Sequence, residues 1–257
     1  MPSWQALHRR RPEDEDGQDR CRDRCGGRNG KAFVARFLAN DDIVIASDTS
    51  EEALEKLQAE LGHERLHVKH GDISDERDTQ ALADLAQEAG GRVDVLVNAA
   101  GWFPIQPFEE VTADDFRKVV DINLTGTFLV IKAIYPLMKN GWGRIINFGS
   151  GSTFVGVATQ AHYVAAKAGV TGLTRSIARA LGGENITVNV ITPGLTVTPV
   201  VKRNFPSELL DESVKARAIQ REEIAEDLVG AVFFLASPDA DFISGQTINV
   251  DGGAFMI

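Results

Sequence analysis

The stretch "GRIINFGSGSTFVGVATQAHYVAAK", residues Gly143–Lys167, joins the two patterns that decide the fold. Its beginning, "GRIINFGS", is a short β-branched and apolar run, typical of a strand buried on both faces of a sheet. Its end opens a longer segment, 162–181, whose pattern predicts a helix. A buried strand that leads into a long helix favours a βαβ unit and a parallel sheet.

The same alternation continues on both sides of this stretch. It predicts strands at 42–48, 65–72, 93–101, 143–150, 186–194 and 245–250, and helices at 31–39, 50–61, 75–89, 112–140, 162–181 and 222–237. The fold class is therefore α/β: a doubly wound parallel sheet (Rossmann type) in a single domain over residues 27–257, with about seven strands and helices on both faces. Such sheets bind ligands beyond the carboxyl ends of their strands.

Composition narrows the function classes. The 257 residues suit one domain, and the net charge of -10 disfavours nucleic acid as a partner. No apolar run is long enough for a membrane span, and the first residues lack the apolar core of a signal peptide. Cys21 and Cys25 have no further cysteine or patterned histidine beside them, so we expect neither a disulfide framework nor a metal site. These features favour a cytoplasmic protein with a small-molecule substrate.

Three side chains carry complementary chemistry. Tyr163 and Lys167 are one helical turn apart, and Ser150 ends the preceding strand. An isolated tyrosine is a poor base at neutral pH, but a neighbouring ammonium group favours the phenolate and lowers the pKa of the tyrosine. A serine hydroxyl beside them can hold a substrate oxygen, so the three predict a proton-transfer site for an alcohol or a carbonyl.

With this order of motifs, the chain resembles the short-chain dehydrogenase/reductase family over about residues 27–257. The motifs are "NAAG" at Asn98–Gly101, "INLTG" with Asn123, "INFGS" with Ser150, "YVAAK" with Tyr163 and Lys167, "TPGLTVT" with Thr198, and the closing "GQTINVDGG". Ala99 and Gly149 depart from the family's usual asparagine and serine at their positions. The chain looks closest to members that act on aryl alcohols such as 1-phenylethanol, or on pyridoxal.

The resemblance implies a role for each catalytic position. Tyr163 would exchange a proton with the substrate oxygen, and Ser150 would orient that oxygen. Lys167 would lower the pKa of the tyrosine and hold the cofactor ribose, while Asn123 would kink its helix and hold a water in the proton relay. The implied fold unit includes a substrate loop at about 195–222.

The implied cofactor is NAD. Asp48 ends a predicted strand, where an acid hydrogen-bonds the ribose hydroxyls and repels the 2′-phosphate of NADP. The implied cofactor-binding positions are Gly30, Asp48, Asp72, Ile73, Asn98, Ala99, Ala100, Gly101, Tyr163, Lys167, Pro193, Gly194, Thr196 and Thr198. The alternative for Asp48 is a carboxylate that only caps the following helix.

The expected activity is hydride transfer between NAD and a secondary alcohol or ketone. Trp102, Phe103, Ser152 and Phe154 fall near the expected pocket and favour an apolar or aromatic substrate, although ordinary packing would also explain the aromatic rings. One alternative is a 3-oxoacyl-acyl-carrier-protein reductase, which normally prefers NADP. Another is a catalytically impaired member that acts as an assembly subunit. Apolar helices at the positions of the family's interfaces predict a homotetramer or homodimer.

Residues 1–26 do not follow the family's pattern. The phosphate loop should carry three glycines, but only Gly30 is present, and Arg24 and Arg28 occupy the other two positions. A one-base shift of the codons for 17–31 can spell the missing strand and glycines in register. We therefore interpret 1–26 as an aberrant, frame-shifted segment and expect weak NAD binding; a genuinely divergent N-terminus is the alternative, and the coding DNA distinguishes them.

Overall fold

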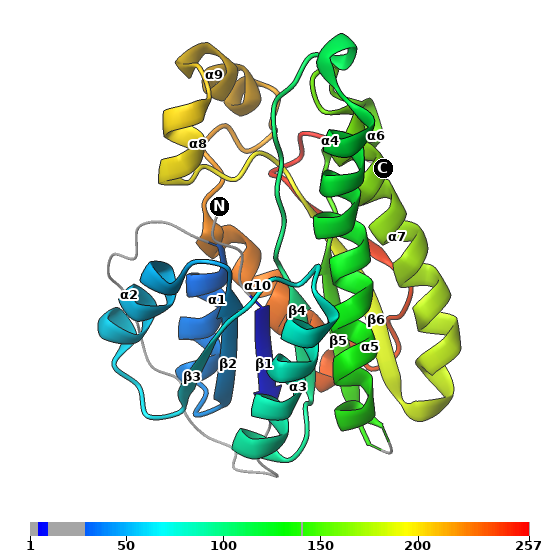
Figure 1. Ribbon diagram of the computed structural model, residues 1–257. Coiled ribbons are helices and arrows are strands. Elements are labelled where there is room, and N and C mark those ends of the chain that lie inside the picture. The colour runs from blue at the N-terminus through cyan, green and yellow to red at the C-terminus, as the bar shows by residue number, and fades with distance from the viewer. Residues whose placement is uncertain (1–4, 10–28, 140, 257) are drawn as a thin grey trace.

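The computed structural model describes residues 5–9, 29–139 and 141–256. Their core is a seven-stranded sheet in the order β3-β2-β1-β4-β5-β6-β7 (Figure 1). The strands are β1 (Gln5–Arg9), β2 (Ile43–Asp48), β3 (Leu66–His70), β4 (Val95–Asn98), β5 (Gly143–Phe148), β6 (Ile186–Pro193) and β7 (Thr247–Val250). The six strands predicted from the sequence are thus confirmed, together with the total of seven.

The strand in the centre of the sheet is the unexpected one. β1 lies between β2 and β4 and runs antiparallel to both, pairing Leu7 with Ile45 on one side and with Leu96 on the other. Every other neighbouring pair is parallel. The polar first residues show no core-forming pattern, so the sequence did not predict the placement of 5–9 in the sheet. Residues 18–23, where the family pattern would place its first strand, and the residues Cys21, Arg24, Cys25 and Arg28 lie outside the described residues.

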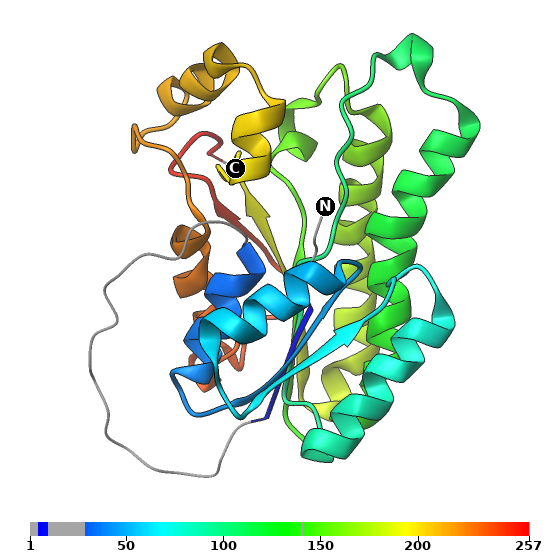
Figure 2. The same cartoon turned by 60° about the vertical axis from the view of Figure 1, so that its left-hand side comes forward.

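Helices cover both faces of the sheet. They are α1 (Asn29–Leu38), α2 (Glu51–Leu61), α3 (Glu76–Gly90), α4 (Ala113–Val120), α5 (Gly126–Met138), α6 (Ser152–Val155), α7 (Ala161–Leu181), α8 (Pro199–Asn204), α9 (Ser207–Lys215) and α10 (Ala225–Leu235). Single 3₁₀ turns occur at η1 (Phe108–Glu110), η3 (Gly182–Glu184) and η4 (Pro238–Ala240). The second view of the ribbon shows the same layers from the side (Figure 2).

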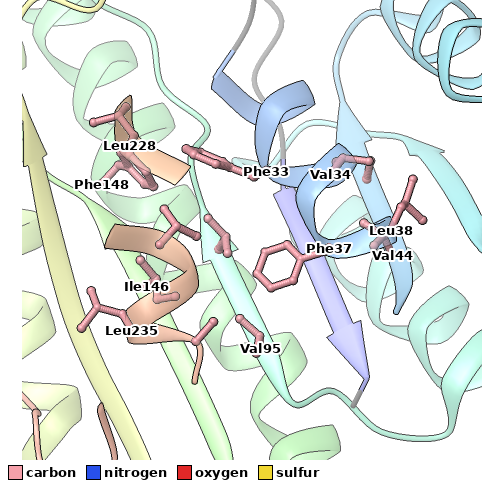
Figure 3. Close-up of a cluster of buried hydrophobic side chains, with 14 of the residues drawn as sticks. Phe33, Val34, Phe37, Leu38, Val44, Val95, Ile146, Phe148, Leu228 and Leu235 are labelled. Atoms are coloured by element: carbon pink, nitrogen blue, oxygen red, sulfur yellow. The ribbon is translucent and has the colours of Figure 1, made fainter. Parts of the chain in front are cut away.

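Strands β2, β4, β5 and β6 are rich in apolar residues because both of their faces are buried. Along β4, Val95 and Val97 belong to the core formed with α1, α2 and α10, whereas Leu96 belongs to the core formed with α3 and α5. The first of these cores is drawn in Figure 3, where Phe33 and Phe37 of α1 lie among strand and α10 side chains. This alternation with period two explains why continuous apolar runs predicted the strands correctly.

Capping residues set one end of each of the helices α2, α3 and α4. Ser50 caps α2 through the backbone N–H of Ala53, and the Thr112 and Asp115 side chains form a capping box at α4. Gly91 ends α3 with a φ of 73°, a left-handed conformation that favours glycine. The helix ranges predicted from the sequence, 50–61, 75–89 and 112–140, agree with these ends.

The helix from Ala113 to Met138 has the length and composition of a membrane span. In this structure it is part of the globular domain, because Val130, Ile131 and Ile134 of its second half pack into the core with α3 and the sheet. A buried core helix meets the same length and composition criteria.

Two short helices, in a segment that the sequence predicted to be a loop, lie beyond the carboxyl ends of the strands. α8 and α9 lie above the sheet, on the same side as α6 (Figure 1). They occupy the middle of the predicted substrate loop at 195–222. We refer to residues 199–215, which form α8 and α9, as the cover.

Candidate active site

A cavity of about 460 Å³ opens at the carboxyl ends of the strands, below the cover. Eleven of the residues expected in the site line it: Ala99, Gly101, Phe103, Ser150, Ser152, Tyr163, Lys167, Pro193, Gly194, Thr196 and Thr198. They come from the ends of β4, β5 and β6 and from α7. The position agrees with the general rule for ligand sites in open parallel sheets.

The serine, tyrosine and lysine meet on one wall of this cavity. Ser150 follows β5, and its Oγ lies 2.8 Å from Oγ of Ser152. Lys167 donates from Nζ to the carbonyl of Phe148 at 2.9 Å, and the same Nζ lies 5.8 Å from the centre of the Tyr163 ring. The spacing of four on α7 thus places both side chains beside the end of β5, as the sequence predicted.

The pKa of the tyrosine differs from the expectation. Burial raises the pKa of the Tyr163 hydroxyl to about 12, and a hydrogen bond with the Ser150 side chain opposes this shift. Burial also lowers the pKa of Lys167 to about 8. The expected lowering of the tyrosine pKa by the lysine is therefore absent from the protein alone, because desolvation dominates and Lys167 is turned to the Phe148 carbonyl. Tyr163 is protonated at neutral pH.

Asn123 lies at the centre of a π-helical turn, η2 (Asp121–Thr125), between α4 and α5. Its side-chain Nδ2 donates to the carbonyls of Trp102 and Val119 at 2.8 and 2.9 Å, and its Oδ1 accepts from the Trp102 N–H at 3.2 Å. The amide bonds to the Trp102 backbone tie the helix to the loop after β4. π-Helical turns within α-helices are frequent at functional sites. Asn123 itself is fully buried and does not line the cavity.

A close approach at Gly101 shapes the wall between these groups. A Cβ atom at this position would lie 2.9 Å from Oδ1 of Asn123 and 3.3 Å from Nζ of Lys167. Only glycine leaves the backbone of the "NAAG" turn this near to the lysine. The open cavity and this side-chain-free wall are consistent with the backbone approach that a dinucleotide requires.

The remaining positions that the resemblance assigns to the cofactor lie outside the cavity lining. Asp48 is buried at the end of β2, and its Oδ1 accepts from the Ser50 N–H at 2.8 Å. Asp72 is exposed after β3, where it accepts from Ser74, and Ile73 is buried against Gly126. Gly30 is buried as the second residue of α1. These residues, with Asn98 and Ala100, do not line the cavity but flank it on the β2–β4 side.

The aromatic residues divide into two groups. The Phe103 ring lies 6.1 Å from the Tyr163 ring and 6.3 Å from the Phe205 ring of the cover, measured between centroids. Trp102 instead faces Lys118, whose Nζ lies 4.9 Å from its ring, and it does not line the cavity. Phe154 packs against Phe255 and is also absent from the lining. Of the three rings expected near the substrate, the structure brings only Phe103 to the cavity.

Several lining residues had no signal in the sequence. The apolar ones are Val155, Val157, Leu195, Val201, Phe205, Leu209 and Phe255, and the charged one is Arg217. They lie in connections and in the cover, where no periodic pattern marks a face. Only the resemblance-based substrate loop at 195–222 pointed to part of this set.

No metal centre accompanies the site: within the ranges that the structure describes, no three His, Cys, Asp or Glu side chains are placed to hold a metal ion.

Comparisons with known proteins agree with this geometry. A family model described as "Enoyl-(Acyl carrier protein) reductase" matches residues 30–254. The chain is 34% identical to meso-2,3-butanediol dehydrogenase of Serratia marcescens, over 89% of this chain and 91% of the relative. It is 37% identical to trans-4-hydroxycyclohexanecarboxylate dehydrogenase of Sinomonas cyclohexanicum, over 82% of both chains. A crystal structure of a short-chain dehydrogenase/reductase named glucose/ribitol dehydrogenase, from Brucella melitensis, superposes with a TM-score of 0.85 at 31% identity and covers 90% of this chain and 94% of that one.

Proposed function

Because the chain belongs to the short-chain dehydrogenase/reductase family, whose dehydrogenases act on alcohols and ketones with a nicotinamide cofactor, we propose that it transfers a hydride between NAD and an apolar secondary alcohol or ketone. The observation that carries the proposal is the convergence of Ser150, Tyr163 and Lys167 on one wall of the cavity. The cofactor would supply the hydride chemistry, and the protein supplies orientation and proton transfer.

Tyr163 is the proton-transfer group in this proposal. With a pKa of about 12 in the protein alone, its hydroxyl carries a proton at neutral pH and is ready to donate it to a ketone oxygen. In alcohol oxidation the phenolate form of Tyr163 must instead accept the proton from the alcohol, so that direction is favoured by higher pH. Ser150, which already hydrogen-bonds Tyr163, would hold the substrate oxygen within reach of it.

Lys167 and Asn123 would support the proton path. Lys167 is buried and has a pKa of about 8, so its ammonium group releases a proton more readily than an exposed lysine does. When Nζ is charged it would hold a ribose hydroxyl and stabilise a developing phenolate at Tyr163. Asn123 would hold the "NAAG" turn against the π-helical turn through its bonds to Trp102.

The preference for NAD is supported by Asp48. Its carboxylate is buried at the end of β2, where a 2′-phosphate would meet a negative charge. No lysine or arginine lies between Asp48 and Lys56 to neutralise such a phosphate. The hydrogen bond from Ser50 shows that Asp48 also organises the start of α2, and one carboxylate oxygen suffices for that role.

The proposed substrate class rests on the apolar side chains that line the cavity. Phe103, Phe205, Phe255 and Leu195 give the cavity a largely apolar wall. The two charged lining residues are accounted for, since Lys167 belongs to the proton path and Arg217 faces Glu223. A neutral substrate with an aliphatic or aromatic ring fits such a wall better than one with several charges.

A second candidate activity is 3-oxoacyl-acyl-carrier-protein reduction. A relative of that name from Synechocystis is 36% identical over 88% of this chain. A non-catalytic assembly subunit is the remaining alternative, which the altered residues ahead of Gly30 favour.

One activity screen separates these possibilities. The purified chain is assayed with NAD and NADP against 1-phenylethanol, cyclohexanol and 2,3-butanediol, and with NADH and NADPH against a 3-oxoacyl thioester. We expect NAD-linked turnover of the ring alcohols. Turnover only with NADPH and the thioester supports the second candidate, and calorimetry that detects no NAD binding supports the assembly subunit.

A further inference from the structure

The connection between β6 and α8 is held by two buried charged side chains outside the catalytic group. Four consecutive residues, 194–197, each form a hydrogen bond with either Glu223 or Arg217. Both charged side chains are buried, with 4% of each residue exposed. This segment contributes Gly194, Leu195 and Thr196 to the cavity wall, so its position matters for whatever the cavity binds.

Glu223 makes three of the four bonds. Its Oε2 accepts from the Gly194 N–H at 3.1 Å, and its Oε1 accepts from the Thr196 hydroxyl at 2.6 Å. Its backbone carbonyl accepts from the Val197 N–H at 2.7 Å, within a parallel bridge between Thr196 and Glu223. One residue thus fixes both the backbone and a side chain of the connection.

Arg217 completes the arrangement. Its Nη2 donates to the Leu195 carbonyl at 2.9 Å and lies 3.7 Å from Oε2 of Glu223, while its Nη1 donates to the Arg221 carbonyl at 2.9 Å. Leu195 precedes the cover and Arg217 follows it. The pair therefore ties the two ends of the cover together at its base.

The fit around Gly194 is close. A Cβ atom at this position would lie 2.8 Å from Oε2 of Glu223 and 3.2 Å from Nη2 of Arg217. Only a residue without a side chain allows both charged groups to reach the connection. Glu223 does not line the cavity, so it holds the wall from behind rather than meeting a ligand itself.

Stability alone is a weak reason to bury such a pair. Removing two charges from water is costly, and well-packed apolar residues often serve the fold as well or better. What the pair provides, and apolar residues cannot, is directional bonding to each successive residue of a connection that has no helix or sheet partners of its own beyond one bridge.

We propose that Glu223, with Arg217 as its counter-ion, is a positioning residue that sets the Gly194–Thr198 wall for cofactor and substrate. The expected effect on KM rests on the proposed function. The expected effect on the structure of the connection does not depend on that function. Neighbouring Glu222 offers a matched control, because it pairs with Lys202 of the cover at 3.0 Å while both side chains are largely exposed. Exposed pairs of this kind contribute little.

The test compares Glu223→Ala, Glu223→Gln and the control Glu222→Ala with the wild-type chain. Glutamine keeps an oxygen for the Gly194 N–H and an amide that can donate to the Thr196 hydroxyl, so it is the conservative replacement. The first readout is backbone hydrogen exchange in peptides that span 194–206. The second is the KM for NAD and for the best alcohol from the screen, measured separately from kcat, together with the pH profile.

We expect Glu223→Ala to speed exchange in 194–206 and to raise both KM values roughly 10- to 100-fold, as misplacement of a binding wall by about 1 Å does. Glu223→Gln is expected to keep the exchange rate and both KM values close to those of the wild type. Glu222→Ala is expected to change neither the exchange rate nor the KM values. The pH profile, which reports Tyr163, is expected to stay the same in all variants.

Two results overturn the proposal. One is unchanged exchange in Glu223→Ala. The other is a KM that rises in Glu223→Gln while exchange stays at the wild-type rate, because the carboxylate would then act on the ligand directly. If Glu223→Ala does not fold, the exchange rate and the KM values of Glu223→Gln, compared with those of Glu222→Ala, decide whether the proposal stands. If the wild type shows no NAD-linked turnover, the proposed function fails, and hydrogen exchange alone still decides whether Glu223 holds the wall.

Discussion

At the scale of single residues, the candidate chemistry rests on how burial changes two neighbouring pKa values. Burial raises that of Tyr163 and lowers that of Lys167, so desolvation acts on both members of the pair. The charged form of each side chain is disfavoured, which keeps the tyrosine protonated and makes the lysine easier to deprotonate. Three predictions belong to this scale.

Tyr163→Phe removes the hydroxyl that exchanges a proton with the substrate and leaves the ring in place. We expect turnover to fall roughly 10²-fold or more, with NAD affinity nearly unchanged, since proton transfer alone is lost. Steady-state kinetics and calorimetry measure the two quantities. Activity near that of the wild type would remove Tyr163 from the catalytic role.

Lys167→Met tests the cost of burying the ammonium group. The pKa of Lys167 falls from 10.5 to about 8 on folding, so between these values the unfolded chain binds more protons and the wild type gains stability as the pH rises. Removing the charge at neutral pH should stabilise the fold by up to about 3 kcal/mol, less the loss of the hydrogen bond to Phe148. Activity should be lost at the same time.

The measurement is the difference in unfolding free energy between variant and wild type from pH 7 to pH 10.5. We expect the stabilisation to be full below pH 8 and to shrink toward pH 10.5. A difference that does not change over this range would show that the ammonium group is not desolvated.

Asp48→Ala tests the cofactor preference. Without the carboxylate, the 2′-phosphate of NADP no longer meets a buried negative charge, so the ratio of kcat/KM for NAD to that for NADP should fall, by roughly tenfold or more. Ser50→Ala is the matched control, because it removes the cap of α2 and leaves the carboxylate. If the ratio stays constant in Asp48→Ala, the aspartate only organises the start of α2.

At the scale of elements, strands with two buried faces could be predicted and the irregular parts could not. β2, β4, β5 and β6 are continuous apolar runs because each contributes to both cores, and that pattern is visible in the sequence. The sequence did not predict α8 and α9 within the cover. Only single residues near these short helices, such as Phe205 and Leu209, face the cavity, so no helical pattern of apolar residues marks them. β1 gave no signal, because its five residues, QALHR, include only two apolar ones.

Likewise, some features of the candidate site could be predicted from the sequence and others could not. Ser150, Tyr163 and Lys167 follow fixed spacings from a strand end, so the sequence located them. The pKa of Tyr163 depends on solvent exclusion by the folded chain, which no spacing reports. Likewise, the bonds of Glu223 to the β6–α8 connection join residues that no motif relates.

Leu7→Pro tests β1 as the central strand. Leu7 pairs with a neighbour on each side, and proline lacks the N–H that a central strand must donate. We expect a loss of roughly 3 kcal/mol in the free energy of unfolding and a matching fall in Tm. Met256→Pro, at an exposed position after the last strand, is the control and should have little effect. Unchanged stability in Leu7→Pro would show that 5–9 does not fill the sheet centre.

At the scale of the whole molecule, the surface carries apolar residues that a single chain leaves uncovered. Phe116 and Phe128 are exposed on the helix from Ala113 to Met138, and Phe242 is fully exposed just before the edge strand β7. Exposed apolar side chains beside a sheet edge are characteristic of association sites. This distribution supports the expectation of a homotetramer, or at least a dimer.

Multi-angle light scattering at micromolar concentration measures the assembly. We expect a mass of four or two chains for the wild type, and a smaller mass for Phe242→Glu, which places a charge in the apolar surface beside β7. Phe108→Glu, at another exposed position on the loop after β4, is the control and should leave the mass unchanged. A wild type that is monomeric contradicts the expectation.

The direction of β1 also decides where a tag or linker can be attached without covering the cavity. Gln5 pairs with Ser47 and Asn98, so the chain enters the sheet at the carboxyl ends of β2 and β4, beside the cavity. A purification tag or surface linker joined ahead of Gln5 therefore shares the approach route of a ligand. Ala254 and Phe255, which follow β7, line the cavity, so a fusion at that end of the chain starts near the same edge. Anchoring through η3 (Gly182–Glu184), just before β6 begins at the opposite edge, keeps the catalytic face clear.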